Sequence, residues 1–281
     1  MDGLRQTQKT IGVFFRIAAC LLIFLSRGCR NPNYSEPMIN GYLYRGEYYD
    51  YSVDYERFVQ VIDNRGLRMV PVVWLNDETL DVFYYTWTEY RYGDTLKFAV
   101  NCPYRLLVEH YWGKANARVT MPGNFSIITP PEGYILDLDS TLCISWHSSA
   151  GAEWYQVELV IDYEYRDSTG GEDDYTFSLD TIIKDTFLIV PRERVFPNNV
   201  MDVIEGDGSA MIMAGCGPAI EPGDKGNVSG AGFGFFNALN EPREKYFYVG
   251  APISVRRCPD MLDAREQRLN GLRRRSAALL K

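Results

Sequence analysis

The chain has 281 residues, of which 46% are hydrophobic, 23% charged and 14% aromatic, and its mass is 32.2 kDa. This length suits one large domain or two ordinary ones, and the composition excludes disorder over most of the chain. With 20 tyrosines against two histidines, the composition favours half-buried β-strands over a histidine-based catalytic or metal centre.

Charge is distributed unevenly along the chain. Residues 1–29 hold four basic residues and one acidic residue, and residues 256–281 hold eight and three, so residues 30–255 keep 17 basic against 33 acidic residues, a net charge of −16. An acidic body repels polyanions, so nucleic acid is not an expected partner.

The first 29 residues predict an export signal. Arg5, Lys9 and Arg16 precede the apolar run 17–25, which is followed by Ser26-Arg27-Gly28-Cys29. This is the order of a signal peptide, and the apolar run of about ten residues is too short to span ~30 Å of hydrocarbon.

Gly28-Cys29 after this leucine-rich run resembles a bacterial lipobox. The resemblance implies that Cys29 is diacylated and becomes the mature N-terminus, which would anchor the protein to a membrane in the cell envelope, on the periplasmic or outer-membrane side. Cys20, after Ile17-Ala18-Ala19, is a second candidate. The alternative is an ordinary signal peptide with an unmodified cysteine and a secreted protein.

The remaining cysteines are Cys102, Cys143, Cys216 and Cys258. Export permits disulfides, and four cysteines allow three connectivities, among which the sequence does not choose.

No motif predicts catalysis, a metal or a cofactor. Cys/His spacing for zinc is absent, and no nucleophile elbow, metalloprotease or phosphate-loop motif is present. His110 and His147 are expected to be ordinary surface or edge residues.

Residues 30–66 are rich in tyrosine without a clean period, so we expect a tether or an irregular first layer, whose tyrosines could also bind glycan or protein. From Leu67 the period becomes two. Five short strands are expected, at 69–75, 82–90, 95–100, 104–111 and 115–121, which favours a β-sandwich over 67–129.

A second β-sandwich is expected over 130–255, after the Pro- and Gly-rich stretch 130–133. Its strands alternate at 141–146 and 154–161 and continue at 175–179, 187–190, 210–214 and 245–249. The glycine-rich stretch 205–240 is interpreted as a long insertion between the last strands, with Gly232 and Gly234 allowing a close backbone approach.

The tail 256–281 predicts a basic helix with a leucine stripe. One interpretation is that this helix packs on the acidic body or frays in solvent. The other is that it contacts anionic lipid or a partner.

Three residues of the second sandwich carry a family resemblance. Trp146 at the end of the second strand, Tyr155 at the start of the third and Pro191 after the fifth resemble a fibronectin type III domain. The preceding strands resemble the immunoglobulin-like module that comes before such domains in bacterial envelope lipoproteins. The resemblance implies an all-β fold of two tandem antiparallel β-sandwiches, immunoglobulin-like and then fibronectin type III-like.

These features predict a non-catalytic envelope lipoprotein, structural or adhesive, that presents loops to a protein or glycan ligand. The alternative is a carbohydrate-active extracellular module that binds or hydrolyses glycans. A binder needs an exposed aromatic platform, whereas a hydrolase needs two carboxylates within ~5–10 Å in a cleft.

Overall fold

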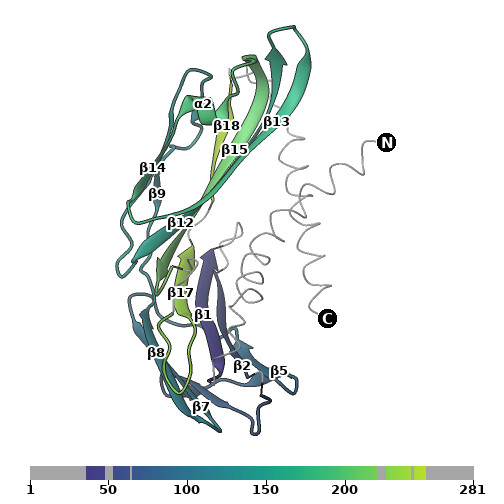
Figure 1. Cartoon of the computed structure of the whole chain (residues 1–281). Helices are drawn as coiled ribbons and strands as arrows, with labels where there is room; N and C mark the ends of the chain where they lie inside the picture. Colours follow the sequence, from purple (N-terminus) through teal and green to yellow (C-terminus); the bar gives the residue numbers. More distant parts are fainter. Residues whose placement is uncertain (1–35, 48–52, 64, 220–225, 242–243, 251–281) are drawn as a thin grey trace.

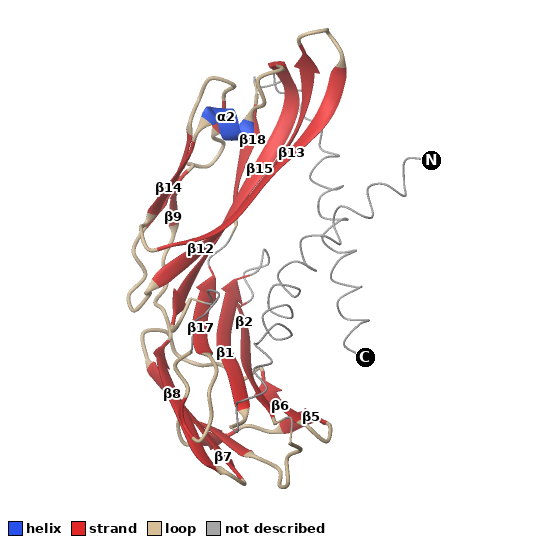
Figure 2. Cartoon of the chain, viewed as in Figure 1, coloured by secondary structure: helices blue, strands red, loops and turns tan. Residues whose placement is uncertain are grey.

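The computed structural model describes residues 36–47, 53–63, 65–219, 226–241 and 244–250, and it has two lobes arranged end to end (Figure 1). The described residues form strands and loops apart from one helical turn, α2 (Arg192–Val195), which confirms the predicted all-β class (Figure 2). Each lobe has its own hydrophobic core. The predicted signal segment and the C-terminal helix lie outside the described residues.

The first lobe is a sandwich of two antiparallel sheets. One has the strand order β1-β2-β6-β5 and the other β8-β7-β3-β4. Lettered A, B, C, C′, D, E, F and G along the chain, these sheets are ABED and GFCC′, the order of a constant-type immunoglobulin domain with one extra short strand. The strands are β1 (Met38–Glu47), β2 (Val53–Ile62), β3 (Val72–Leu75), β4 (Glu78–Thr79), β5 (Val82–Tyr85), β6 (Glu89–Asp94), β7 (Pro103–His110) and β8 (Gly113–Thr120).

Much of the stretch predicted as a tether or irregular first layer forms regular strands. β1 and β2 pair over ten residues, from Met38 opposite Ile62 to Glu47 opposite Val53. The period was hidden because β1 has strands on both edges and is buried even at polar positions such as Asn40 and Arg45.

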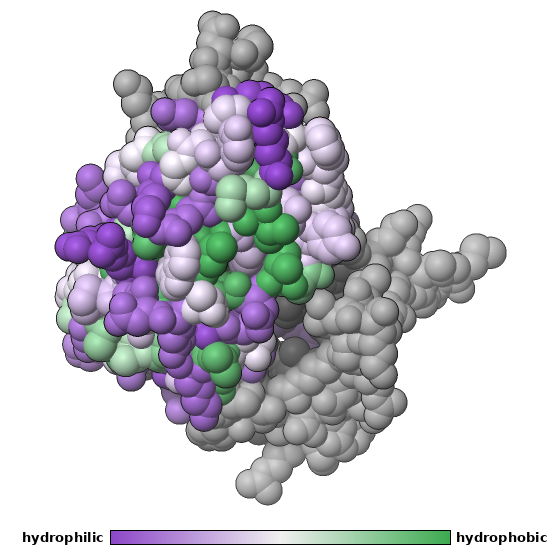
Figure 3. Space-filling model, turned by 90° about the horizontal axis from the view of Figure 1, so that it is seen from below, coloured by the Kyte–Doolittle hydropathy of each residue, from purple (hydrophilic) through white to green (hydrophobic). Residues whose placement is uncertain are grey.

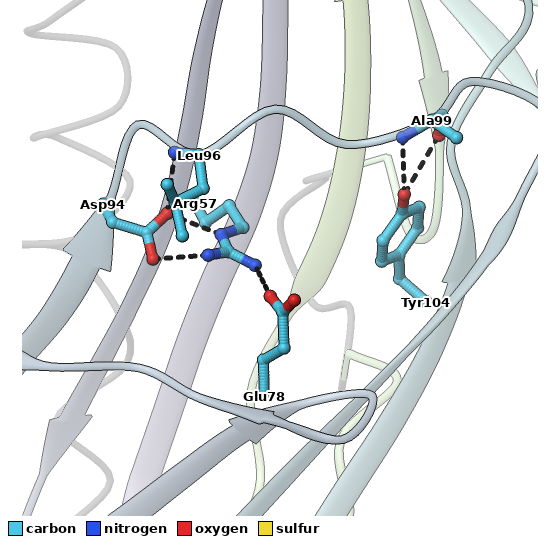
Figure 4. A network of polar contacts seen from close by, with 6 residues as sticks. All are labelled: Arg57, Glu78, Asp94, Leu96, Ala99 and Tyr104. Carbon is cyan, nitrogen blue, oxygen red and sulfur yellow. Dashed lines mark hydrogen bonds and ion pairs between the residues drawn. The ribbon is translucent and has the colours of Figure 1, made fainter.

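The stretch 95–100, expected to be a strand, is a loop held at both ends. At one end the backbone N–H of Leu96 donates to Asp94 Oδ1 at 3.1 Å. At the other, the hydroxyl of Tyr104 accepts from the N–H of Ala99 at 2.8 Å and donates to its carbonyl at 3.1 Å (Figure 4). Such a tyrosine corner at the start of strand F, here β7, is typical of immunoglobulin-like sandwiches.

Arg57 ties the two sheets of the first lobe together. From β2 its guanidinium donates to both carboxylate oxygens of Asp94, at 2.5 and 2.6 Å, and to Glu78 of the opposite sheet at 2.5 Å (Figure 4). Because Arg57 is buried, its pairing satisfies a charge that would otherwise be costly there.

The second lobe is also a sandwich. One sheet has the order β14-β11-β9, and the other contains β13, β12, β15 and β18, with the short β10 parallel to β18. The strands are β9 (Ile127–Thr129), β10 (Ile135–Leu136), β11 (Leu142–Trp146), β12 (Trp154–Asp167), β13 (Glu172–Ile183), β14 (Phe187–Val190), β15 (Val200–Cys216) and β18 (Lys245–Val249).

The three residues that carried the resemblance lie where it implies. With β9 and β10 counted as one interrupted first strand, Trp146 ends the second strand, Tyr155 is the second residue of the third, and Pro191 follows the fifth. Trp146 and Tyr155 meet edge to face in the core, with ring centroids 5.4 Å apart.

An insertion between β15 and β18 leaves the second lobe and completes the first. Its strand β16 (Ser229–Gly230) pairs with β8, and its strand β17 (Phe236–Glu241) pairs in parallel with β1 and antiparallel with the end of β15. Phe236 and Ala238 are buried in the first core. The lobes are therefore joined by a continuous hydrogen-bonded sheet, and the two cores do not divide at one position in the sequence.

Glycine is required where the insertion passes the first lobe. Gly234 has φ +132°, and a Cβ there would lie 2.0 Å from the carbonyl oxygen of Ile39. A Cβ at Gly232 would lie 2.8 Å from the side chain of Ile39. The close backbone approach predicted at these two glycines is confirmed, but the insertion begins only after Cys216, because residues 205–216 belong to β15.

A buried polar network fixes the connection between the lobes. The amide of Asn240, which is 1% exposed, donates to the carbonyls of Pro122 and Gly123 at 3.1 and 2.7 Å. Its oxygen accepts from Arg45 Nη1 at 2.9 Å, and the same nitrogen donates to Asn124. A residue of the insertion thus holds the linker between the two sandwiches.

Candidate functional site

Three connections of the first lobe meet at the end farthest from the second lobe: the β2–β3 loop, the β5–β6 turn and the β7–β8 turn. The backbone N–H of Leu67 donates to the carbonyl of Trp87 at 3.0 Å, and Trp112 Nε1 donates to Asp63 at 2.8 Å, so the three are bonded to one another. We name this surface the aromatic tip. Its exposed side chains are Arg65, Arg68, Met69, Val70, Tyr85, Trp87, Tyr111 and Trp112.

Trp87 is the most exposed large side chain of the tip. Its indole lies against Gly66, where φ is +84° and a Cβ would come within 2.5 Å of the ring. The side chain is nevertheless 74% exposed, so the ring is seated on backbone and presents the rest of its surface to solvent. Beside it, Tyr85 is 70% exposed and stacks on Tyr90 with centroids 5.9 Å apart.

Two arginines lie over the aromatic rings of the β7–β8 turn. The guanidinium carbon of Arg65 is 4.1 Å from the ring centroid of Trp112, and that of Arg68 is 5.3 Å from Tyr111 and 5.4 Å from Trp112. Such contacts contribute roughly 0.5–1 kcal/mol each at exposed sites. The tip therefore combines cationic and aromatic groups in a fixed arrangement.

A buried carboxylate organises these groups. Asp63 accepts from the Arg65 side chain at 2.9 and 3.0 Å and from the Trp112 indole. Burial alone would raise the pKa of Asp63, but these hydrogen bonds and the charge of Arg65 outweigh it and hold the pKa below its usual value. Asp63 thus stays ionised and keeps two of the three connections in register.

The end of the molecule seen from below carries hydrophobic residues in its middle, among hydrophilic ones (Figure 3). Large hydrophobic side chains are also exposed on the strands next to the tip, at Val72 of one sheet and at Val82 and Phe83 of the other. Exposed apolar surface is typical of interaction sites when it gathers in one patch, as it does at this end of the molecule.

A second feature is a carboxyl group at the junction of the lobes. The pKa of Glu241 is raised to about 7, mainly by burial; the negative charges of Glu244 and Glu158 act in the same direction, and a hydrogen bond from the Tyr44 hydroxyl acts against them. A carboxyl group with a pKa near neutrality has the property required of a general acid.

The histidines differ from one another. His147 is exposed as predicted, with Nδ1 2.9 Å from Ser126 Oγ. The prediction for His110 is wrong: the inward alternation of β7 buries it, its Nδ1 accepts from the Trp112 N–H at 3.2 Å, and burial lowers its pKa. His110 is therefore a neutral, buried residue, and its hydrogen bond with Trp112 helps to hold the β7–β8 turn of the tip.

Among the cysteines within the described ranges, Cys102, Cys143 and Cys216 carry free thiols. Cys143 is exposed, and Cys216 is buried in the first core, where burial raises the pKa of its thiol. Cys20, Cys29 and Cys258 lie outside the described residues, so the predicted lipidation site stays a prediction.

Two kinds of feature are absent from the described residues. In this part of the chain no helix has the length and apolar character needed to cross a membrane. Within the same ranges, no group of three or more His, Cys, Asp or Glu side chains could hold a metal ion.

Sequence reasoning did not identify the aromatic tip. The signal that could have found it is the Tyr111-Trp112 pair, two large aromatic residues at the edge of the predicted turn 112–114, where small polar residues are usual. Trp87 gave no such signal, because it lay within the predicted strand 82–90, whereas the structure places it in the turn between β5 and β6.

No family model and no curated protein matches the chain. Solved structures similar to it are the fibronectin(III)-like modules of Clostridium thermocellum CbhA (8% identity, 76% of this chain, 94% of that chain, TM-score 0.27) and the tandem Ig repeats of Dlar (14%, 74%, 99%, 0.21). A third is the N-terminal Ig1-2 module of the Drosophila receptor protein tyrosine phosphatase DLAR (13%, 72%, 98%, 0.22). At these TM-scores the similarity carries no argument, and the description of the lobes rests on their own strand order and register.

Proposed function

We propose that the protein is a non-catalytic, adhesive component of the cell envelope that contacts its partner through the aromatic tip. Export by residues 1–29 and a lipid anchor on Cys29 belong to this proposal and are supported by the sequence pattern alone.

The observation that carries the proposal is the aromatic tip itself. Tryptophan, tyrosine and arginine dominate the energetics of binding surfaces, and here all three are exposed together on connections mounted on a rigid sandwich. The corresponding end of a variable immunoglobulin domain carries its binding loops. Fold alone does not imply function, so the argument rests on these side chains.

Trp87→Ala tests the tip as a binding surface. The measurement is retention of residues 31–281, which include every described residue, on an isolated bacterial envelope fraction. Loss of a central tryptophan is expected to weaken retention by about 30-fold. The matched control is Phe187→Ala, another exposed aromatic residue, on the second lobe.

Equal retention of the two variants would remove the tip as the binding surface. Both variants should keep the thermal stability of the parent chain, because both side chains are exposed.

The anchor is tested separately on the chain with its native N-terminus, expressed in a bacterial host. A mature chain that begins at Cys29, carries acyl mass and moves from the membrane to the soluble fraction on Cys29→Ser is the expected result. A chain without acyl mass would contradict lipidation.

A second candidate function, glycoside hydrolysis, is favoured by Glu241, whose pKa is about 7 and which interacts with the carboxylates of Glu158 and Glu244 at the junction of the lobes. Hydrolysis of cell-wall or plant polysaccharides by the parent chain, lost by about 100-fold or more in Glu241→Gln with glycan binding retained, would support it. Absence of hydrolysis by the parent chain would exclude it for those substrates.

A further inference from the structure

We propose that the partner of the aromatic tip is the lipid surface of the membrane in which the protein is anchored. This inference rests on the proposed function, because it names the partner of the same site.

The direction of β1 places the tip next to the anchor. β1 begins at Met38, which lies opposite Ile62, the last residue before the β2–β3 loop of the tip. Pro37 is bonded to the insertion at this same end, through the N–H of Phe233. The chain therefore enters the first lobe at the tip and runs toward the second lobe (Figure 1).

The distance to the anchor is short. Between Cys29 and Glu36, the first described residue, seven residue steps span at most ~25 Å. A lipid on Cys29 thus holds the tip, rather than the second lobe, close to the membrane. The same holds if the apolar run 17–25 stays in the membrane as an uncleaved anchor.

The chemistry of the tip fits a lipid–water interface. Trp87 and Tyr85 offer apolar rings with one polar group, the type of side chain enriched at membrane interfaces. Met69 and Val70 are exposed apolar residues on the adjoining loop. Arg68 can bury its aliphatic stem while its guanidinium group reaches headgroup phosphates, whereas the guanidinium of Arg65 is held by its ion pair with Asp63.

Charge at the opposite end of the molecule favours the same orientation. Near the β12–β13 hairpin, Asp162 lies opposite Asp207, and Glu164 lies opposite both Asp174 and Glu205. Like charges in direct register destabilise a sheet, and they concentrate negative potential at the end far from the tip (Figure 1). An anionic membrane repels this end and attracts the arginines of the tip, so the field turns the tip toward the lipid.

The test uses the full lipid-modified chain in vesicles of phosphatidylcholine and phosphatidylglycerol with brominated acyl chains, which quench tryptophan fluorescence on contact. Emission should fall below that in the same vesicles without bromine. Trp87→Phe should reduce the quenching about twofold or more, because Trp87 is the most exposed tryptophan. Trp154→Phe, at the buried junction, is the matched control and should leave it unchanged.

A second comparison tests the cationic part. In vesicles that contain phosphatidylglycerol, Arg68→Gln should weaken the tip contact about fivefold, whereas vesicles of phosphatidylcholine alone should show little effect. Arg105→Gln, an exposed arginine of β7 away from the tip, is the control.

Equal emission in brominated and ordinary vesicles would overturn the lipid inference. If Trp87→Ala still abolishes retention on the envelope fraction, the tip binds a protein or glycan and the proposed function stands. If Trp87→Ala changes neither quenching nor retention, both proposals fail.

Discussion

The two lobes are built from the same kind of sandwich but differ in how far each can stand alone. The second lobe takes its sheets from one stretch of chain, interrupted by the insertion before β18. The first lobe borrows β16 and β17 from that insertion, and Phe236 and Ala238 fill its core. The lobe that carries the aromatic tip therefore depends on the other lobe for part of its core.

The largest expected effect comes from blocking the entry of the insertion. Gly234→Val places a side chain against the backbone of Ile39 at a φ of +132°, and it should lower the free energy of unfolding by about 3 kcal/mol or more. Urea unfolding followed by far-UV circular dichroism measures this.

Gly170→Val is its control, since Gly170 also has positive φ, +83°, but a Cβ there meets nothing within 4 Å. It should cost only the backbone strain, about 1–2 kcal/mol. Equal losses in the two variants would show that the insertion does not hold the first lobe.

A slightly smaller effect is expected from Asn240→Ala at the junction. The change removes two donors to the linker carbonyls and the acceptor for Arg45, so the free energy of unfolding should fall by about 2–3 kcal/mol. Asn198→Ala, an exposed asparagine of the second lobe, should change stability by less than about 0.5 kcal/mol. Calorimetry that finds no difference between them would remove the network as a lock between the lobes.

Acidity should affect the junction through Glu241. Its pKa in the folded protein, about 7, lies above the ordinary 4.5, so the folded state binds the extra proton between these values. Stability contributed by this group is full below pH 4.5 and is lost as pH rises through 7, on the order of 3 kcal/mol in all.

In Glu241→Gln the side chain at position 241 cannot ionise. The free energy of unfolding of this variant, relative to that of the parent chain, should therefore rise from pH 5 to pH 8. Melting temperatures of both chains across this range measure the difference. Groups present in both chains, such as His110, contribute equally to each, so their effects cancel. A constant difference would contradict the raised pKa.

The smallest perturbation is alkylation of cysteine side chains, which compares the two lobes without changing their stability. Alkylation by iodoacetamide should be fast at Cys143, which is exposed on β11, and slow at Cys216, whose burial in the first core shields the thiol and raises its pKa. Mass spectrometry of peptides over time gives both rates. Gly234→Val should accelerate labelling of Cys216 alone, and acceleration of Cys143 as well would indicate that both lobes loosen together.

The sequence predicted the second lobe well because its strands alternate locally, as in Leu142, Ile144 and Trp146. β1 could not be recognised, because its buried polar residues have partners 195 residues away: Arg45 donates to Asn240 of β17, and Asn40 accepts from the backbone of Phe235, just before β17. Such parallel pairing leaves no local pattern.

Neither candidate site, the aromatic tip or Glu241, could be predicted from the sequence, for the same reason. The turns of Trp87 and Trp112 are each bonded to the β2–β3 loop only in the folded sandwich, and the pKa of Glu241 depends on burial beside Tyr44 on another strand. The lipid anchor, in contrast, is predicted by local pattern alone.

The position of β1 has a mechanical consequence. β1 is bonded on one edge to β2 over ten residue pairs and on the other to β17 over six. A pull on the chain from the anchor side enters at Met38 and acts along the strand. It loads the hydrogen bonds on both edges in shear, all at once, instead of peeling them one by one. The first lobe is thus arranged to bear tension applied between the start of β1 and the far end of the molecule.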